Sequence, residues 1–352
     1  MLSSDDGGFD PREFTKIKGS SGAWELTTKD PVTVGLRVKT MERVAPSSLA
    51  RARKARGPRL AEPFRPSWQP YIYHPKTTTA RVEPPTLTRK GGASVRPHTV
   101  FNRDDRELLF PDGYPWHCIG KVLVTARDGT KTVGTGTLVG ARTVLCSGHM
   151  MKWGNTSQIQ FIPGRFNSQV MPSIERAAGG RARSSFVTEV FGYNVPGRAA
   201  WDIAVLRLAE PLGEWLGTLG ARPYDDDWED DPRWTLVGYP GQWGYRTVIE
   251  PFLGLPVVIP FNEGDVPTRQ FGISVEDDDS DGNALELEHR ADTSEGNSGG
   301  PLFGHWPKGP YVIGVHSGQL IGDNTFGTSM INVAAGGNAM VDLVQWARAT
   351  WV

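Results

Sequence analysis

One serine stands between glycines in a segment that could carry out nucleophilic chemistry. The segment is Gly296-Asn297-Ser298-Gly299-Gly300, and an apolar strand start, Pro301-Leu302-Phe303, follows it at once. Glycines allow tight turns in which successive backbone N–H groups point toward one place. Such N–H groups can stabilise a negative oxygen that forms beside the serine. The Ser298 hydroxyl alone is a weak nucleophile, so this chemistry also requires a neighbouring base and a carboxylate that holds the base.

His149 is the strongest candidate base among the seven histidines of the chain. It follows the run Thr143-Val144-Leu145-Cys146-Ser147-Gly148, in which an apolar strand ends in small residues. A side chain at such a strand end is held by a rigid element and still faces a cleft. Taken alone, a histidine at this place is more often structural than catalytic.

Asp202 is the matching carboxylate. It begins the apolar run Asp202-Ile203-Ala204-Val205-Leu206, and a charge that enters a protein core is costly unless another group pairs with it. An imidazole N–H would satisfy this carboxylate. The alternative is an aspartate that caps the local backbone at the start of a strand.

Taken together, the three segments resemble the catalytic segments of the trypsin-like serine peptidases, which have the chymotrypsin fold. His149 stands in VLCSGHM, Asp202 in WDIAVLRL and Ser298 in EGNSGGPLF, in the order that this family follows. The resemblance covers about residues 116–352. It implies a double β-barrel, with His149, Asp202 and Ser298 in the cleft between the barrels and an oxyanion hole made by the N–H groups of Gly296 and Ser298.

Within that family, the sequence most resembles the glutamyl-endopeptidase branch. Asn297 precedes the serine, where trypsin itself carries an aspartate that pairs with a new N-terminus. The resemblance implies that Thr293 and His316 bind an acidic side chain before the scissile bond, in a substrate pocket that also includes Asp292 and Ser317. A hydroxyl donor and a chargeable imidazole are suitable partners for a carboxylate.

Three alternatives remain open at this point. Asp292 occupies the place where trypsin-like enzymes carry the aspartate that selects Arg or Lys, so cleavage after basic residues is possible. The chain could also be a catalytically silent binding protein on the same fold. The segment around Ser298 fits G-x-S-x-G, the nucleophile turn of α/β-hydrolases, but that fold requires parallel strands and a later Asp and His.

The composition is that of an ordinary globular protein, with 352 residues, 38% hydrophobic residues and a formal net charge of -1. We therefore expect protein or peptide substrates, no nucleic-acid partner, no membrane span and a monomer. The acidic runs at residues 225–231 and 276–281 lack an EF-hand pattern and are interpreted as solvated loops. No metal or cofactor is expected. Cys118 and Cys146 allow one disulfide at most, and whether they pair is left open.

The pattern of short strands and turns predicts an all-β fold. One set of strands predicts a six-stranded antiparallel barrel at about 116–212. A second set begins at 234–237, continues through 246–249, 284–287, 311–315 and 330–333, and predicts a second such barrel at about 232–336. Apolar residues at helical spacing predict a C-terminal helix at about 338–350, with Asn338 as its cap. These elements make up the predicted peptidase domain, residues 101–352.

Residues 1–100 differ in texture, with many prolines, a basic run at 51–56 and weak apolar periodicity. We expect a poorly structured N-terminal arm or a pro-segment that restrains activity. The first residues lack the basic and apolar regions of a signal peptide. The family resemblance implies secretion, so the sequence leaves the localisation unknown.

Overall fold

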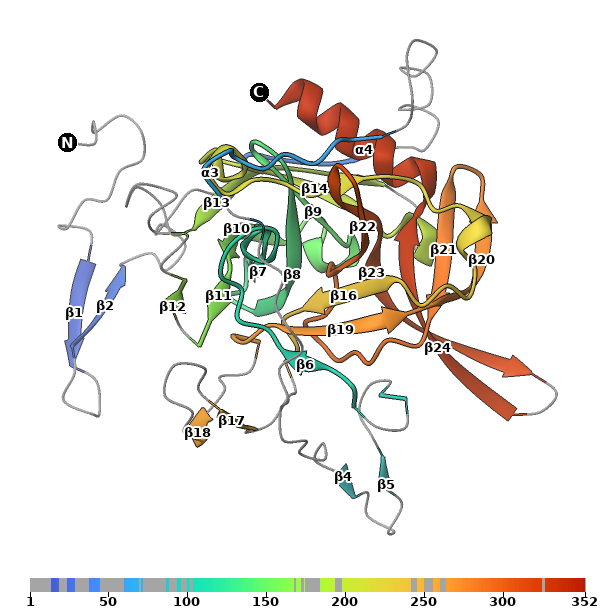
Figure 1. The fold of residues 1–352 in the computed structure, drawn as a ribbon. Helices are drawn as coiled ribbons and strands as arrows, with labels where there is room; N and C mark the ends of the chain where they lie inside the picture. The colour runs from blue at the N-terminus through green and yellow to red at the C-terminus, as the bar shows by residue number, and fades with distance from the viewer. Residues whose placement is uncertain are drawn as a thin grey trace.

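The computed structural model of the chain is dominated by β-strands (Figure 1). It describes residues 14–18, 24–28, 38–44, 60–69, 71, 87–88, 94–95, 100–101, 104–167, 169–171, 174, 184–193, 198–241, 246–249, 256–259, 264–324 and 327–351. The all-β prediction is confirmed, and the longest helix in these residues is the C-terminal one. Among the described helices, none is long and apolar enough to cross a membrane.

The first barrel is a closed ring of six antiparallel strands. Its strand order is β10–β7–β8–β9–β14–β13, and β13 pairs back with β10 through Phe186 and Ser185, which lie opposite Gln160 and Phe161. The bounds are β7 (Ile119–Ala126), β8 (Lys131–Gly140), β9 (Thr143–Cys146), β10 (Thr156–Pro163), β13 (Ser185–Tyr193) and β14 (Ala204–Leu208).

Side chains at alternate positions of the strands fill the interior of this barrel. In β7, Val122, Val124 and Ala126 are buried while the residues between them are partly exposed, as expected for a strand with one face on a core. β9 and β14 contain mostly apolar residues and are buried throughout most of their length. The prediction of a six-stranded antiparallel first barrel is therefore confirmed, and its strands run from Ile119 to Leu208.

The second sheet curls into the other half of the molecule. Its strand path is β20–β21–β24–β23–β22–β16–β19–β6, with β15 paired beside β23. Its first and seventh strands, β20 and β19, are separated in the chain by Ser274 alone, so the two sides of the sheet must return toward each other. The bounds are β6 (Glu107–Leu108), β15 (Gly220–Ala221), β16 (Trp234–Gly238), β19 (Thr268–Ile273), β20 (Val275–Asp281), β21 (Ala284–His289), β22 (Pro301–Trp306), β23 (Gly309–Asn324) and β24 (Gly327–Gly336).

One predicted strand of the second set lies outside this sheet. β17 (Arg246–Ile249) pairs only with β18 (Pro256–Ile259) among the described residues. The sheet uses β19 and β20 instead, which the sequence analysis did not predict. β20 reads VEDDDSD, and aspartate is depleted in strands, so its sequence gave a loop signal.

Helix α4 (Gly337–Thr350) packs against strands of both sheets, among them β14 and β21 (Figure 1). Met340, Leu343 and Val344 are fully buried in the main apolar core, to which both sheets contribute residues. The helix begins at Gly337, where the predicted cap Asn338 already lies within the first turn, and no side chain caps it. The predicted C-terminal helix is confirmed, and its predicted cap is wrong.

Segments of the predicted arm pair with this body. β3 (Thr40–Val44) joins the first barrel as a parallel neighbour of β13. Ala61 and Phe64 form bridges with Ala221 and Thr218. The predicted boundary near residue 100 stays a prediction, but β3 and the bridges at residues 61 and 64 connect parts of the arm to the two main sheets.

The remaining described elements are short. They are the pairs β1 (Phe14–Lys18) with β2 (Trp24–Thr28), β4 (Leu87–Thr88) with β5 (Ser94–Val95) and β11 (Arg165–Phe166) with β12 (Gln169–Val170), helix α3 (Leu212–Leu216) and the 3-10 turns η2 (Trp116–Cys118), η3 (His149–Met151), η4 (Ala199–Trp201) and η5 (Asp226–Trp228).

The two cysteines are separate buried thiols. Cys118 Sγ donates to the carbonyl of Leu216 at 3.6 Å, and Cys146 Sγ donates to the carbonyl of Thr135 at 3.0 Å. Burial raises the pKa of both thiols, so neither is a reactive thiolate. The pairing that the sequence left open is thus absent from this structure.

Candidate active site

Adjacent strand ends bring His149 and Asp202 together. β9 and β14 are antiparallel neighbours in which Cys146 lies opposite Ala204. His149 starts the 3-10 turn η3 just after β9, and Asp202 lies just before β14. Gly148 leaves room between them, because a Cβ atom there would stand 3.3 Å from Asp202 Oδ1.

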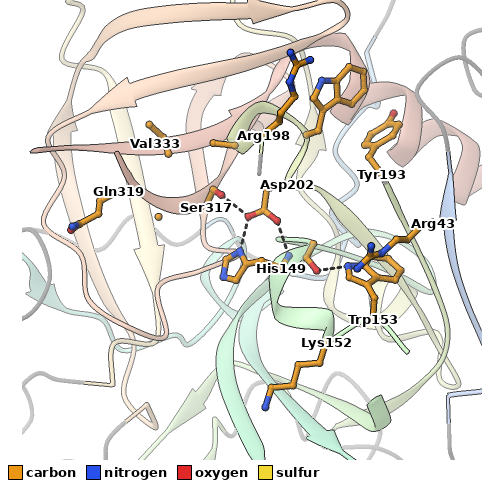
Figure 2. Close-up of a pocket in the computed structure, with 14 residues that line it drawn as sticks. Arg43, His149, Lys152, Trp153, Tyr193, Arg198, Asp202, Ser317, Gln319 and Val333 are labelled. Atoms are coloured by element: carbon orange, nitrogen blue, oxygen red, sulfur yellow. Dashed lines mark hydrogen bonds and ion pairs between the residues drawn. The ribbon is translucent and has the colours of Figure 1, made fainter. Parts of the chain in front are cut away.

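Asp202 holds both the ring and the backbone of His149. Its Oδ2 lies 2.6 Å from His149 Nδ1, and its Oδ1 accepts the His149 backbone N–H at 2.6 Å. A third hydrogen bond comes from the hydroxyl of Ser317, which donates to Oδ2 at 2.5 Å. Figure 2 shows these contacts around the carboxylate. With Nδ1–H bound in this way, the proton-accepting nitrogen of a neutral His149 is Nε2.

The electrostatics of the pair favour an ionised carboxylate beside an accessible imidazole. Burial by itself raises the pKa of Asp202, but the hydrogen bond and charge of His149, with the Ser317 hydroxyl, outweigh burial and leave that pKa lowered. Burial lowers the pKa of His149, and the hydrogen bond and charge of Asp202 outweigh it and leave the pKa raised. The side chain of Asp202 is 13% exposed and that of His149 is 47% exposed.

The loop that carries Ser298 requires glycine at two positions. Gly296 has a φ of +94°, and a Cβ there would lie 2.2 Å from the carbonyl oxygen of Tyr239. Gly299 has a φ of +83°, and its Cβ would lie 2.2 Å from the carbonyl oxygen of Thr135. Any other residue would be strained and would clash with backbone. The glycines therefore let this loop press against both halves of the molecule.

Thr135, a residue that the sequence analysis did not single out, fixes this loop from the first barrel. Its backbone N–H donates to the carbonyl of Ser298 at 2.8 Å, and its hydroxyl donates to the carbonyl of Gly296 at 2.8 Å. The same hydroxyl accepts the N–H of Tyr239 at 2.9 Å. One threonine of β8 thus links the serine loop to β16 and the segment after it.

Two backbone N–H groups in the loop are left without an acceptor. The carbonyl of Glu295 accepts the N–H of Gly241 at 2.5 Å, which turns the following Gly296 N–H the opposite way. Within the described part of the chain, neither Gly296 N–H nor Ser298 N–H donates a hydrogen bond. Unpaired N–H groups of this kind are costly unless they serve a ligand or solvent.

Asn297 stabilises the loop from within. Its side-chain oxygen accepts the N–H of Ser294 at 3.1 Å, and its own N–H donates to the carbonyl of Ser294 at 3.0 Å. Asn297 is 2% exposed. A neutral amide therefore holds the loop through local hydrogen bonds, with no charged partner required.

Ser298 lies against the strand end that carries His149. A Cβ at the next residue, Gly299, would be 2.6 Å from Cys146 Sγ and 3.1 Å from the backbone nitrogen of Ser147. Within the described residues, the Ser298 hydroxyl makes no hydrogen bond, either to His149 or to another group. Catalytic hydrogen bonds are often long or poorly aligned in ligand-free proteins, so the lack of this hydrogen bond does not exclude a catalytic role for Ser298.

His316 is a buried histidine beside the serine loop. Its backbone N–H donates to the carbonyl of Gly300 and its carbonyl accepts the N–H of Gly299, both at 2.8 Å. Its ring is 5.6 Å from that of His289, centroid to centroid. Burial, followed by the neighbouring His289 and His149, lowers the pKa of His316 well below its usual value.

Each of these two histidines has one buried ring nitrogen without a hydrogen-bond partner among the described residues. His289 Nδ1 accepts the N–H of Ala291 at 3.2 Å, so its proton is on Nε2. His289 Nε2 and His316 Nδ1 are both buried without a hydrogen-bond partner among the described residues. Thr293 is also buried, at 4% exposure. His289 was not predicted, because a histidine at a strand end carries no local signal of a partner.

Asp292 is engaged by the segment that precedes the first barrel. One carboxylate oxygen accepts the N–H of Phe101 at 2.8 Å, and the other accepts the N–H of Asp105 at 2.6 Å. The nearby Arg106 guanidinium binds both Asp104 and the hydroxyl of Ser294. Burial, the largest effect, raises the pKa of Asp292 to about 6. Its oxygens are thus used to hold residues 101 and 105.

The remaining predicted pocket residue, Ser317, lies on the other side of this arrangement. Its hydroxyl is bound to Asp202, as described above. It also lines the cavity beside His149 that Figure 2 shows. Among the described residues, no group of three or more His, Cys, Asp and Glu side chains could hold a metal ion.

A family model described as "trypsin-like peptidase domain" matches residues 134–312 of the chain. No curated protein is similar enough in sequence to count as a match. Among solved structures, a Glu endopeptidase in complex with MPD shares 19% identity over 72% of this chain and 100% of its own, with a TM-score of 0.49. Protease Anisep from Arthrobacter nicotinovorans shares 17% identity over 66% of this chain and 93% of its own, with a TM-score of 0.42.

Proposed function

The chain belongs to the trypsin-like peptidase family, a family of serine-type endopeptidases, and on that premise we propose that Ser298, His149 and Asp202 cleave peptide bonds through an acyl-enzyme. Ser298 Oγ attacks the carbonyl carbon of the scissile bond while His149 Nε2 takes its proton. The protonated ring then gives that proton to the departing amine. A water molecule, activated by the same nitrogen, hydrolyses the ester that remains on Ser298.

The single observation that carries this proposal is an imidazole held by Asp202 beside a loop in which two N–H groups bond to no described residue. Asp202 fixes the His149 ring at 2.6 Å and stabilises the positive charge that the ring acquires. The N–H groups of Gly296 and Ser298 are available to the oxygen that becomes negative during attack. Donors that are already in place need no reorganisation during the reaction.

We further propose that the residue before the scissile bond is acidic and binds near Thr293 and His316. The buried His316 Nδ1 has no hydrogen-bond partner among the described residues, and a substrate carboxylate would supply one if the ring takes up a proton. The competing choice, a basic residue bound by Asp292, is less favoured. Both Asp292 oxygens already accept backbone N–H groups, from Phe101 and Asp105.

A peptide library that varies the residue before the scissile bond tests this specificity. We expect Glu to be preferred over Gln by roughly 10- to 100-fold in kcat/KM, the range of a hydrogen bond to a charged group. Asp292→Asn is expected to retain this preference, because the Asp292 carboxylate holds the backbone of residues 101 and 105 rather than the substrate side chain. Cleavage after Arg or Lys that disappears in Asp292→Asn, with no cleavage after Glu, would reject the acidic assignment and establish the basic one.

The pH dependence of kcat/KM reports on His149. The ring must be neutral to accept a proton, so activity is lost as the pH falls through its pKa. Because Asp202 leaves that pKa raised, we expect the acidic limb to have its midpoint above the ordinary value of 6.5. Rates measured from pH 5 to 9 with one peptide check this. A limb centred below 6.5 contradicts the proposed pairing.

A further inference from the structure

The hydroxyl of Thr135 connects the first barrel to the serine loop and to the second sheet. Thr135 lies in β8 and is fully buried. Its hydroxyl donates to the carbonyl of Gly296 at 2.8 Å and accepts the backbone N–H of Tyr239 at 2.9 Å. Tyr239 directly follows β16. One hydroxyl group therefore makes one hydrogen bond to the serine loop and another to the strand end beside that loop.

Three consecutive peptide groups span the two proposed oxyanion donors. The N–H of Gly296 belongs to the first group, and the N–H of Ser298 belongs to the third. The carbonyl of the first group accepts the N–H of Gly241 at 2.5 Å, and the carbonyl of the third accepts the N–H of Gly300 at 2.8 Å. The carbonyl of the middle group accepts the Thr135 hydroxyl. The relative orientation of the two donors therefore depends on all three groups.

The middle peptide group is held at both ends. Its carbonyl, from Gly296, is bound by Thr135, and its N–H, from Asn297, donates to the carbonyl of Ser294 at 3.0 Å. The second of these bonds lies within the loop, so it cannot fix the loop relative to the first barrel. The Thr135 hydroxyl is thus the side-chain contact that fixes this peptide group against β8.

Gly296 makes these external hydrogen bonds necessary. Its φ is +94°, and glycine adopts positive and negative φ about equally well, so the residue itself does not select one orientation for the peptide groups beside it. The Gly241 N–H fixes the group before Gly296, and Thr135 fixes the group after it. Without the second contact the middle group could rotate, and the N–H groups of Gly296 and Ser298 would no longer stay directed to one point.

The residue type at position 135 suits this role. Threonine is branched at Cβ, which restricts rotation about χ1, and Thr135 has no exposed surface. Because the oxygen accepts the N–H of Tyr239, the hydroxyl hydrogen is left for the carbonyl of Gly296. The Thr135 backbone N–H also donates to the carbonyl of Ser298 at 2.8 Å. The hydroxyl is therefore held in one orientation before any substrate binds.

We propose that Thr135 is a positioning residue for the oxyanion hole. Its hydroxyl holds the peptide group between Gly296 and Asn297, and so keeps the N–H groups of Gly296 and Ser298 directed to the oxygen that becomes negative during attack. The inference rests on the proposed peptidase function and adds a group from the first barrel to it. The hydrogen of this hydroxyl is already donated within the protein, so Thr135 acts through the loop and not on the substrate.

Thr135→Val removes the hydroxyl and nearly preserves the shape of the side chain. We expect kcat to fall by roughly 10- to 100-fold, less than the loss of about 10²–10³ that follows removal of an oxyanion donor itself. KM should change by less than about twofold, because the donors act on charge that develops in the transition state. The acidic limb of the pH profile should keep its midpoint, since the bond between His149 and Asp202 is untouched.

Thr137→Val is the matched control. Thr137 lies two residues further along β8, on the same face of the strand, and is equally buried. Its hydroxyl has no hydrogen-bond partner among the described residues, so this variant should retain the kcat of the unaltered chain. Thr135→Ser and Thr135→Ala form a second pair that differs only in the hydroxyl, and serine should retain most of the activity that alanine loses. This pair carries the comparison if Thr135→Val does not fold.

Crystal structures of the two valine variants show the loop independently of activity. We expect the carbonyl of Gly296 to leave its present position only in Thr135→Val. A carbonyl that stays in place there, an unchanged kcat, an equal fall of kcat in Thr137→Val, or a loss confined to KM overturns the inference. If the unaltered chain hydrolyses no peptide but the displacement is found, the proposed function fails while the role of Thr135 in holding the loop stands.

Discussion

Replacing Ser298 with alanine is expected to lower kcat for peptide hydrolysis by about 10⁶, the order of the loss when the nucleophile of such a triad is removed. The alanine cannot form the acyl-enzyme, and the oxyanion donors and His149 then act only on water. The loop should keep its shape, because the contacts that hold it come from Thr135, Asn297 and the glycines rather than from the serine hydroxyl. Steady-state kinetics and circular dichroism measure the two effects.

A fluorophosphonate probe supplies an independent readout of the same residue. The unaltered chain should be labelled and Ser298→Ala should not. Ser280→Ala is the matched control, because Ser280 is an exposed serine on β20 that makes no side-chain hydrogen bond with described residues. Equal labelling of the unaltered chain and Ser298→Ala would remove Ser298 from the mechanism.

Asp202→Asn is expected to lower kcat by about 10⁴ with little change in the fold. Asp202 accepts three hydrogen bonds, from the His149 backbone, the His149 ring and Ser317. Asparagine offers one oxygen and an NH₂ group, so one of the two His149 donors faces another donor. The ring then turns, or holds its proton on the nitrogen that should accept one.

Ser317→Ala is the control for this substitution, because it removes a single hydrogen bond to Asp202 and leaves the His149 contacts. Its loss of activity should be far smaller. Both variants are compared by kcat/KM over pH and by thermal unfolding. If Asp202→Asn retains most of the activity, or if Ser317→Ala loses as much, then the carboxylate does not act by orienting His149.

The sequence predicted the site best where a reactive group and the turn or strand that presents it lie in consecutive residues. The glycines around Ser298, the small residues before His149 and the apolar run after Asp202 each combine a reactive group with the turn or strand that presents it. The all-β class and the C-terminal helix could be predicted as well, because the spacing of apolar residues in strands and helices is also visible in consecutive residues. The assignment of catalytic roles to these residues stays a prediction.

Contacts between distant residues could not be predicted in this way. The pocket role predicted for Asp292 stays a prediction, but the sequence carried no sign that its oxygens bind backbone N–H groups of residues 101 and 105, about 190 positions away. Thr135 was overlooked because an ordinary strand threonine gives no sign that it will meet Gly296 and Tyr239. β3 was missed because its pairing with β13 depends on a strand that lies about 150 residues later.

β3 also covers part of the strand edge at which β13 and β10 close the first barrel. β13 pairs with β10 only at Phe186 and Ser185, while β3 lies along residues 189–193. Without β3, that half of β13 would present unpaired N–H and C=O groups, and an open strand edge is a template for association between molecules. Removing residues 1–100 would therefore remove the strand that covers this edge, along with any restraint on activity. The aggregation and the peptidase activity of the shortened chain must therefore be measured separately.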